Sequence, residues 1–207
     1  MGAKRTARYL IQDPRQIEAL AAPARQEIVD SLAVSGPVSV AELASDLGRA
    51  PDSLYYHLRR LESVGLVVRR GTRPTAQRTE VLYDVPGARM IIDREPGTPA
   101  EKRVLMRVLS SALRSAEREL RDALASGRAV YRRCARRNAW AARVKGWLDP
   151  HELAEVREHL DAVAEILLRG KPRPGASLHT VTHVLAPLEP SRRARTTTAS
   201  PTRKQPR

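Results

Sequence analysis

Polar side chains that can bond DNA recur on one side of the segment 51–63. At 100° of rotation per residue, Leu54, Leu58 and Leu61 form an apolar stripe on the other side. The side chains that point away from this stripe are Asp52, Ser53, Tyr56, Arg59, Arg60 and Ser63. Hydroxyl and guanidinium groups can bond the base edges of a major groove and the phosphates beside it. The spacing therefore predicts a helix that lies in DNA, and a solvated amphipathic helix is the alternative.

Two helices joined by a short turn are expected to position these side chains. Pro51 suits a first helical position, because its missing N–H costs nothing there, and Gly65 suits a helix end. Upstream, Ser39 and Glu42 have the spacing of a capping box, which starts another helix. We expect that helix to end at Gly48, so that two residues separate it from Pro51. This is a helix-turn-helix spacing.

A β-hairpin with a basic tip is predicted directly after the second helix. Residues 66–70 form a short β-prone run, residues 71–78 are polar and rich in turn-forming types, and residues 79–85 alternate as a strand does. A hairpin in this place is a wing. Helix, turn, helix and wing in this order form a far more specific signal than any one of these parts alone.

These segments together resemble the ArsR-like winged helix-turn-helix transcriptional regulators, over residues 14–92. The resemblance is carried by residues 19–25 leading into Ile28 and Leu32, and by residues 40–44, 54–61 and 65–67. It implies a homodimeric bacterial or archaeal regulator that binds an operator with two half-sites. Metal-sensing members carry Cys-x-Cys in the first helix of the motif, where this chain has no cysteine at residues 42–47. We therefore expect the non-metal-sensing branch, with no metal and no cofactor.

Within this domain we assign seven side chains to DNA. Ser53, Tyr56 and Arg60 are the candidates for base edges. Tyr55 and Arg59 flank them and are expected to reach phosphates. Arg73 and Arg78, in the wing, are expected to approach the DNA backbone or the minor groove.

The net charge of +14 is unevenly distributed. Residues 9–92 hold ten Lys or Arg against ten Asp or Glu, so this part is neutral. Between Arg49 and Arg78, however, seven arginines face only Asp52 and Glu62, which leaves +5 over the predicted helix and wing. Such segregation is the electrostatic pattern expected of groove binding. A genome that favours arginine codons would contribute to the same excess.

A long amphipathic helix is predicted after the wing. Thr98 and Glu101 form a capping box, and Gly127 closes a helix of about 28 residues, or about 42 Å at 1.5 Å per residue. It exceeds what a small winged domain can cover, so we expect it to pair two subunits; a long intramolecular packing helix is the alternative. The side chains assigned to this interface are Leu105, Leu109, Ala112, Leu113, Ala116 and Leu120.

A small strand-helix-strand module is predicted for residues 128–188. Residues 140–148 and 178–185 alternate as strands do, and Asp149 with Glu152 opens a helix between them that ends at Gly170. Residues 128–137 hold five arginines and no acid, which suits a solvated connection more than a contact with phosphates or an acidic ligand.

The expected fold is therefore mainly α with β (α+β). Its parts are a flexible basic N-terminus (1–8), a winged helix-turn-helix domain (9–92), a dimerisation helix (93–127), a C-terminal α/β module (128–188) and a disordered basic tail (189–207). The single Cys134 excludes an internal disulfide. No apolar run approaches membrane-spanning length, and the N-terminus lacks an apolar leader, so we expect a cytoplasmic protein.

The function expected from the sequence is transcriptional regulation, most simply repression, by a homodimer on a pseudo-palindromic operator. The partners are double-stranded DNA, a second copy of the chain and an unidentified small-molecule effector, and no membrane is involved. No nucleophile elbow, phosphate loop or carboxylate pair supports catalysis. A non-specific architectural DNA-binding protein and a winged-helix protein-interaction module are the alternatives.

Overall fold

A computed structural model describes residues 6–76, 79–170 and 172–189. Four short helices form the centre of the N-terminal domain: α1 (Pro14–Leu20), α2 (Pro23–Ser35), α3 (Val40–Leu47) and α4 (Pro51–Ser63). Three of them begin with proline at the first helical position. The predicted capping box starts α3, since Ser39 Oγ accepts from Glu42 N at 3.3 Å and Ser39 N donates to Glu42 Oε2 at 2.8 Å.

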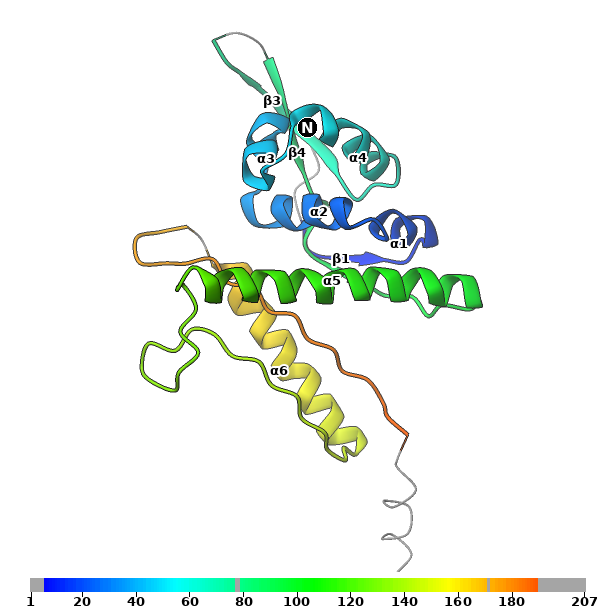
Figure 1. Ribbon diagram of the computed structural model, residues 1–207. Coiled ribbons are helices and arrows are strands. Elements are labelled where there is room, and N and C mark those ends of the chain that lie inside the picture. The colour runs from blue at the N-terminus through cyan, green and yellow to red at the C-terminus, as the bar shows by residue number, and fades with distance from the viewer. Residues whose placement is uncertain (1–5, 77–78, 171, 190–207) are drawn as a thin grey trace, which may run out of the picture.

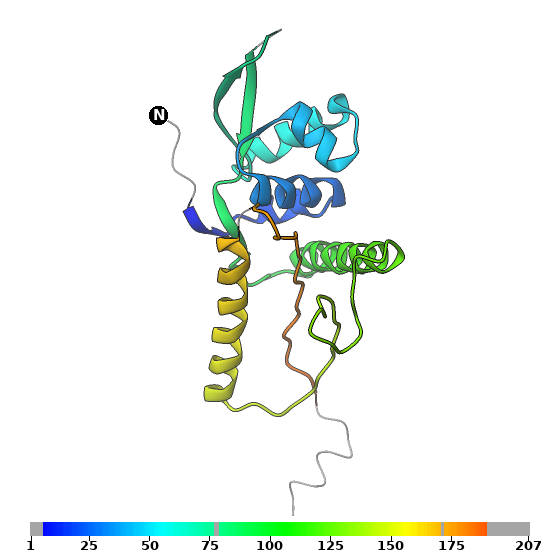
Figure 2. The same cartoon turned by 90° about the vertical axis from the view of Figure 1, so that its left-hand side faces the viewer.

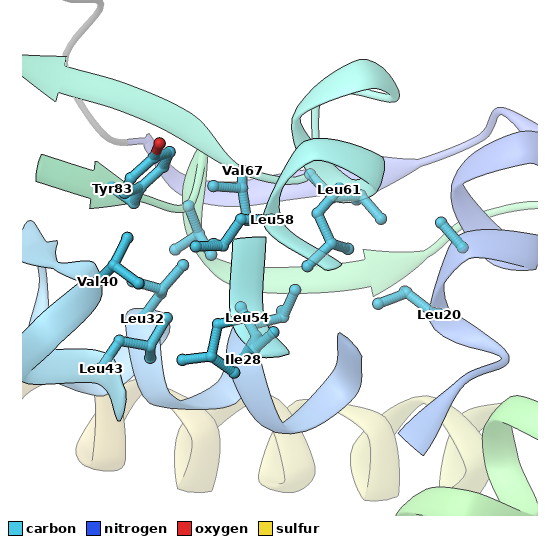
Figure 3. Packing of buried hydrophobic residues seen from close by; sticks show 14 of the residues in the cluster. Leu20, Ile28, Leu32, Val40, Leu43, Leu54, Leu58, Leu61, Val67 and Tyr83 are labelled. Atoms are coloured by element: carbon cyan, nitrogen blue, oxygen red, sulfur yellow. The ribbon is translucent and has the colours of Figure 1, made fainter. Parts of the chain in front are cut away.

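The core of this domain lies where α2, α3 and α4 meet the sheet (Figure 3). Ile28, Leu32 and Leu43 are fully buried there, facing Leu54, Leu58 and Leu61 of α4. Burial of one such side chain stabilises the fold by about 1.5–3 kcal/mol. The three leucines of α4 therefore fix its rotation, as the sequence pattern predicted.

The wing is longer than expected. Strand β3 (Val68–Pro74) pairs with β4 (Thr79–Asp84) in antiparallel register, and the short β2 (Val38–Ser39) completes a sheet of order β2-β4-β3. The prediction ended the first strand at Arg70, whereas β3 continues to Pro74 after an irregularity between Arg69 and Thr72. Gly71 lies in this irregularity with a φ of +109°, so a residue that suggested a turn instead forms part of a bulged strand.

A second sheet, which the sequence analysis missed, ties the N-terminus to the end of the domain. Strand β1 (Thr6–Ile11) runs parallel to β5 (Gly87–Ile92), with Thr6 opposite Gly87. A Cβ at Gly87 would lie 2.7 Å from Tyr9 Cβ, so this pairing requires glycine there. The expected flexible N-terminus of residues 1–8 is thus wrong from Thr6 onward, because a partner 81 residues away leaves no local signal.

The long helix α5 (Pro99–Ala125) was predicted to within a residue or two and starts with the expected capping box. It lies across α1 and α2 and supports the domain from the side opposite the wing (Figure 1). Its Val108 is buried against them. The buried Gln26 of α2 joins all three helices, donating to Leu20 O at 2.8 Å and to Val108 O at 3.1 Å.

The C-terminal part contains the predicted helix but not the predicted strands. Helix α6 (Pro150–Arg169) begins with its Asp149–Glu152 capping box. Its C-terminal end lies beside β1 and its N-terminal end projects away from the rest of the molecule (Figure 2). It is tied to β1 and β5 by ion pairs of Arg8 and Arg89 with Asp161. Residues 140–148 and 178–185 are extended without strand pairing, so an alternating pattern here did not produce a sheet. Across the part of the chain that is described, no helix has the length and apolar character needed to cross a bilayer.

Arg70 and Asp84 form a buried ion pair at the base of the wing. Their side chains are 10% and 2% exposed, and Arg70 Nε donates to Asp84 Oδ2 at 3.3 Å. Asp84 Oδ1 also accepts from Val85 N at 2.8 Å. This pair connects β3 to the end of β4 from within the core.

Replacing Arg70→Ala should lower the free energy of unfolding by about 3–5 kcal/mol, because a buried carboxylate loses its partner. Urea denaturation followed by circular dichroism measures the change. The matched control is Arg69→Ala, which breaks the exposed pair with Glu62 and should cost less than about 1 kcal/mol. Equal losses for the two variants would contradict the role assigned to the buried pair.

Candidate nucleic-acid interface

Helix α4 is presented by a tight turn. Gly48 ends α3 in the left-handed conformation, with a φ of +60°, and Arg49 N donates to Ala44 O at 2.9 Å. Pro51 then begins α4 at the predicted position. Because the turn is short and hydrogen-bonded, the direction of α4 is set by α3 and by the core beneath both helices.

The outward face of α4 carries the five helix residues assigned to DNA. Tyr56 is 63% exposed, and Ser53, Tyr55, Arg59 and Arg60 are exposed as well. Ser53 Oγ donates to Ala50 O at 2.6 Å, which leaves its lone pairs free to accept from a base. The structure thus places on one open surface the residues that the helical spacing grouped together.

Ion pairs remove much of the positive charge that the sequence suggested for this surface. Four of the seven arginines between residues 49 and 78 are paired with acids, and most of those acids lie outside that range. The pairs are Arg49–Glu27, Arg69–Glu62, Arg70–Asp84 and Arg73–Glu42. Within the described part of the chain, Arg59 and Arg60 have no acidic partner. The free charge is therefore concentrated on α4.

Arg73 braces the wing against α3. Its Nη2 lies 2.7 Å from Glu42 Oε2 and 3.7 Å from Glu80 Oε2. The hydrogen bond from Arg73 is the main reason that the pKa of Glu42 is lowered. A DNA contact by Arg73 stays a prediction and would have to compete with this pair. Arg78 lies outside the described residues.

Glu27 of α2 connects the turn before α4 to the long helix, a link that sequence analysis missed. It accepts from Arg49 on one side, and its Oε1 lies 3.5 Å from Arg118 Nη2 of α5 on the other. Glu27 lies 22 positions from Arg49 and 91 positions from Arg118, so no local sequence motif predicts these pairs.

His57 is turned inward from α4. Its ring meets the Tyr56 ring edge-on at 5.4 Å, and its Nδ1 is buried without a hydrogen-bond partner in the described structure. Burial lowers the pKa of His57, and the nearby Arg25 and Arg49 lower it further. The imidazole is therefore held neutral at pH 7.

The residues assigned to dimerisation lie on a side of α5 that the N-terminal domain leaves largely uncovered. Leu109 and Leu113 are 39% and 47% exposed, and Leu105, Ala112, Ala116 and Leu120 are partly buried. At 100° per residue the six positions fall within an arc of about 100° beside Val108. In the described residues, no group of three His, Cys, Asp or Glu side chains could hold a metal ion.

Residues 20–70, or 51 of the 207, match the family model of a helix-turn-helix domain. No curated protein matches the chain. Similar solved structures include Rv1404 from Mycobacterium tuberculosis (19% identity, covering 77% of this chain and 86% of that one, TM-score 0.28). Others are the transcriptional regulator Tm0710 from Thermotoga maritima (16%, 72% and 78%, 0.30) and an oligodeoxyribonucleotide-bound MepR mutant from S. aureus (15%, 74% and 78%, 0.21). These three likenesses are too distant to carry a functional conclusion.

Acidification should destabilise the domain through His57. Its folded pKa lies below the unfolded value of about 6.5, so the unfolded chain binds more protons and stability falls as the pH drops through that value. Thermal unfolding measured at about pH 7.5 and at about pH 5 should show a smaller loss of stability on acidification for His57→Asn than for the unchanged protein. The control is His151→Asn on the exposed surface of α6, which should lose as much stability on acidification as the unchanged protein. An equal loss in the His57 variant would refute this account.

Proposed function

We propose that this protein is a sequence-specific regulator of transcription that binds double-stranded DNA as a homodimer and acts as a repressor on a pseudo-palindromic operator. The observation that carries the proposal is the outward face of α4, where Ser53, Tyr56 and Arg60 are exposed on a helix fixed by its buried leucines. The matched helix-turn-helix model includes all of this helix. We retain the ArsR-like, non-metal-sensing branch as part of the proposal.

On this proposal α4 enters the major groove and the wing follows the adjacent backbone. Arg60 bonds a guanine edge or a neighbouring base, with Ser53 and Tyr56 beside it. Tyr55 and Arg59 reach the phosphates that border the groove. The wing strands project beyond the helical body (Figure 2). Contacts of Arg73 and Arg78 with the backbone or the minor groove are part of this proposal.

The homodimer is proposed from the uncovered apolar side of α5. Two copies related by a two-fold axis would bury the same leucines on each side, as an isologous interface requires. With 27 residues, α5 is about 40 Å long, so it can separate two copies of α4 widely enough for successive major grooves about 34 Å apart. We extend the proposal to a cytoplasmic regulator with a small-molecule effector, for which the hollow of about 230 Å³ between α1 and α5 offers a site.

Selection from a random duplex pool distinguishes this function from its alternatives. A specific regulator enriches sequences with two related half-sites, an architectural protein enriches none, and a protein-interaction module retains no DNA. The unpaired Arg59 and Arg60 favour a DNA-binding protein over a protein-interaction module. The base-bonding side chains grouped on one face of α4 favour a specific regulator over an architectural protein.

Arg60→Ala and Tyr56→Ala should each weaken binding to the selected duplex by about 1–3 kcal/mol, or roughly 5- to 150-fold, while binding to a scrambled duplex changes much less. Fluorescence anisotropy at fixed salt measures both affinities. Arg69→Ala is the control, since it removes an arginine that already pairs with Glu62. If both α4 variants keep the affinity of the unchanged protein, the helix does not face the bases.

Leu109→Asp should convert the dimer to a monomer, because it places an unpaired carboxylate in an apolar helical interface. Size-exclusion chromatography with light scattering reports the mass. Arg107→Asp introduces the same group on the charged side of α5 and should leave the dimer intact. A monomeric unchanged protein at micromolar concentration would rule out the interface.

A further inference from the structure

A second cationic surface lies in residues 127–148, which we name the basic aromatic loop. It contains seven Lys or Arg and no acid, and it holds both tryptophans of the chain together with Tyr131. The cations are Arg128, Arg132, Arg133, Arg136, Arg137, Arg143 and Lys145. In the N-terminal domain most arginines pair with acidic side chains, whereas this loop contains no acidic residue that could pair with its cations.

The first part of the loop has a defined conformation although it contains no helix or strand. Asn138 bridges it, since Val130 N donates to its Oδ1 at 2.7 Å and its Nδ2 donates to Arg128 O at 3.0 Å. Tyr131 Oη donates to Ala141 O at 3.1 Å and accepts from Ala141 N at 2.8 Å. These bonds across eight to ten residues hold the backbone of the loop closed between Arg128 and Ala141.

Aromatic faces and a guanidinium are stacked on this closed loop. The Arg137 guanidinium carbon lies 5.6 Å from the centres of both the Tyr131 and Trp140 rings. Trp140 is nevertheless 67% exposed, and Trp147, farther along the extended segment, is 74% exposed. Large aromatic side chains this open to water leave ring faces available for a flat partner.

Unpaired arginines surround these rings. Arg132, Arg133 and Arg136 are exposed and have no ion pair within the described residues. Arg132 and Arg136 line an open hollow of about 350 Å³ together with Val130, Cys134 and Ala135. Its cationic rim could hold phosphate groups, since the guanidinium fork matches the geometry of a phosphate.

The loop is separate from the surface proposed for duplex DNA. It lies on the side of α5 away from α4 and the wing, in both views of the molecule (Figures 1 and 2). A duplex held by α4 and the wing of the same subunit would have α5 between it and the loop. The loop is therefore placed to bind something other than the duplex held by α4 of the same subunit.

From this juxtaposition we infer that the basic aromatic loop is a binding site for single-stranded nucleic acid. Unpaired bases expose the flat faces that Trp140 and Trp147 can stack on, whereas a duplex hides them. The arginines supply the matching contacts to phosphates. Seven cations distributed over 22 residues exceed what one nucleotide could neutralise, which favours a strand over a mononucleotide.

The position of the tryptophans provides a direct readout. Since both lie in the loop, their emission reports binding there and is insensitive to contacts made by α4. Titration of the full chain with unlabelled (dT)20 or (rU)20, strands of about 20 nucleotides that exceed one site, should quench this emission. Anisotropy of the same strands carrying a dye gives the affinity.

Two sets of variants test the two components of the site. Trp140→Ala should weaken binding of both strands by about 5- to 150-fold, while Trp140→Phe retains most of it, because one stacked base is lost only in the former. The triple variant Arg132→Ala, Arg133→Ala and Arg136→Ala should make the slope of log affinity against log salt shallower by about 2, at about 0.7 per phosphate contact. Its matched control removes Arg103, Arg107 and Arg114 of α5 and should keep the slope.

Titrations with other anionic ligands test whether the loop prefers a single strand. If dTMP alone quenches the tryptophans as tightly as the strands do, the loop binds a mononucleotide and the strand proposal is overturned. Quenching by polyglutamate, or by a blunt duplex of equal length with equal affinity, would overturn it as well. Arg60→Ala should leave the affinity for single strands unchanged. Binding of single strands by the loop is therefore tested independently of duplex recognition by α4.

Discussion

Burial of three leucines on one side of α4 is the constraint on which the proposed DNA-binding surface depends. Leu54, Leu58 and Leu61 are at most 1% exposed, and each would lose about 1.5–3 kcal/mol if it were turned to water. Rotation of α4 about its axis is therefore strongly opposed. Because a helix has a fixed angle per residue, the same constraint orients Tyr56 and Arg60 outward without any contact of their own.

Pairing of charges, as distinct from their number, decides which parts of this chain can bind an anion. Arginines at the base of the wing and beside the turn serve the fold, through acids such as Glu27 and Asp84. Those on the outer side of α4 and in the basic aromatic loop lack such partners in the described structure. The arginines named here thus divide into structural ones and two separate groups that are available to an anion.

Local signals predicted the helices well, because each depends on a few neighbouring residues. Three capping boxes, at Ser39, Thr98 and Asp149, start helices as expected. Strands depend on distant partners, and there the sequence was a poorer guide. The β1–β5 pair was missed, since its strands are far apart in the chain, and the two strands expected at 140–148 and 178–185 remain unpaired.

The candidate site shows the same division. Helical spacing identified the exposed side chains of α4 from positions alone. The partners of Arg49, Arg70 and Arg73 could not be inferred, because their acids come from other elements of the fold. The sequence therefore overestimated the charge available on the wing, while the surface of α4 was assigned correctly to the exposed side of its helix.

Glu27 links the long helix α5 to the turn of the helix-turn-helix motif. Gln26, its neighbour, is hydrogen-bonded to the α5 backbone, and Glu27 holds Arg118 and Arg49 at once. Val108, where α2 holds α5, lies 17 residues from the end of the helix at Ala125, or about 26 Å at 1.5 Å per residue, so a tilt of about 5° moves that end by about 2 Å. A displacement of that size would tilt α5 where Glu27 contacts it, and the same carboxylate holds Arg49, two positions before α4 begins. We therefore expect a movement at the remote end of α5 to reach α4 through a single carboxylate.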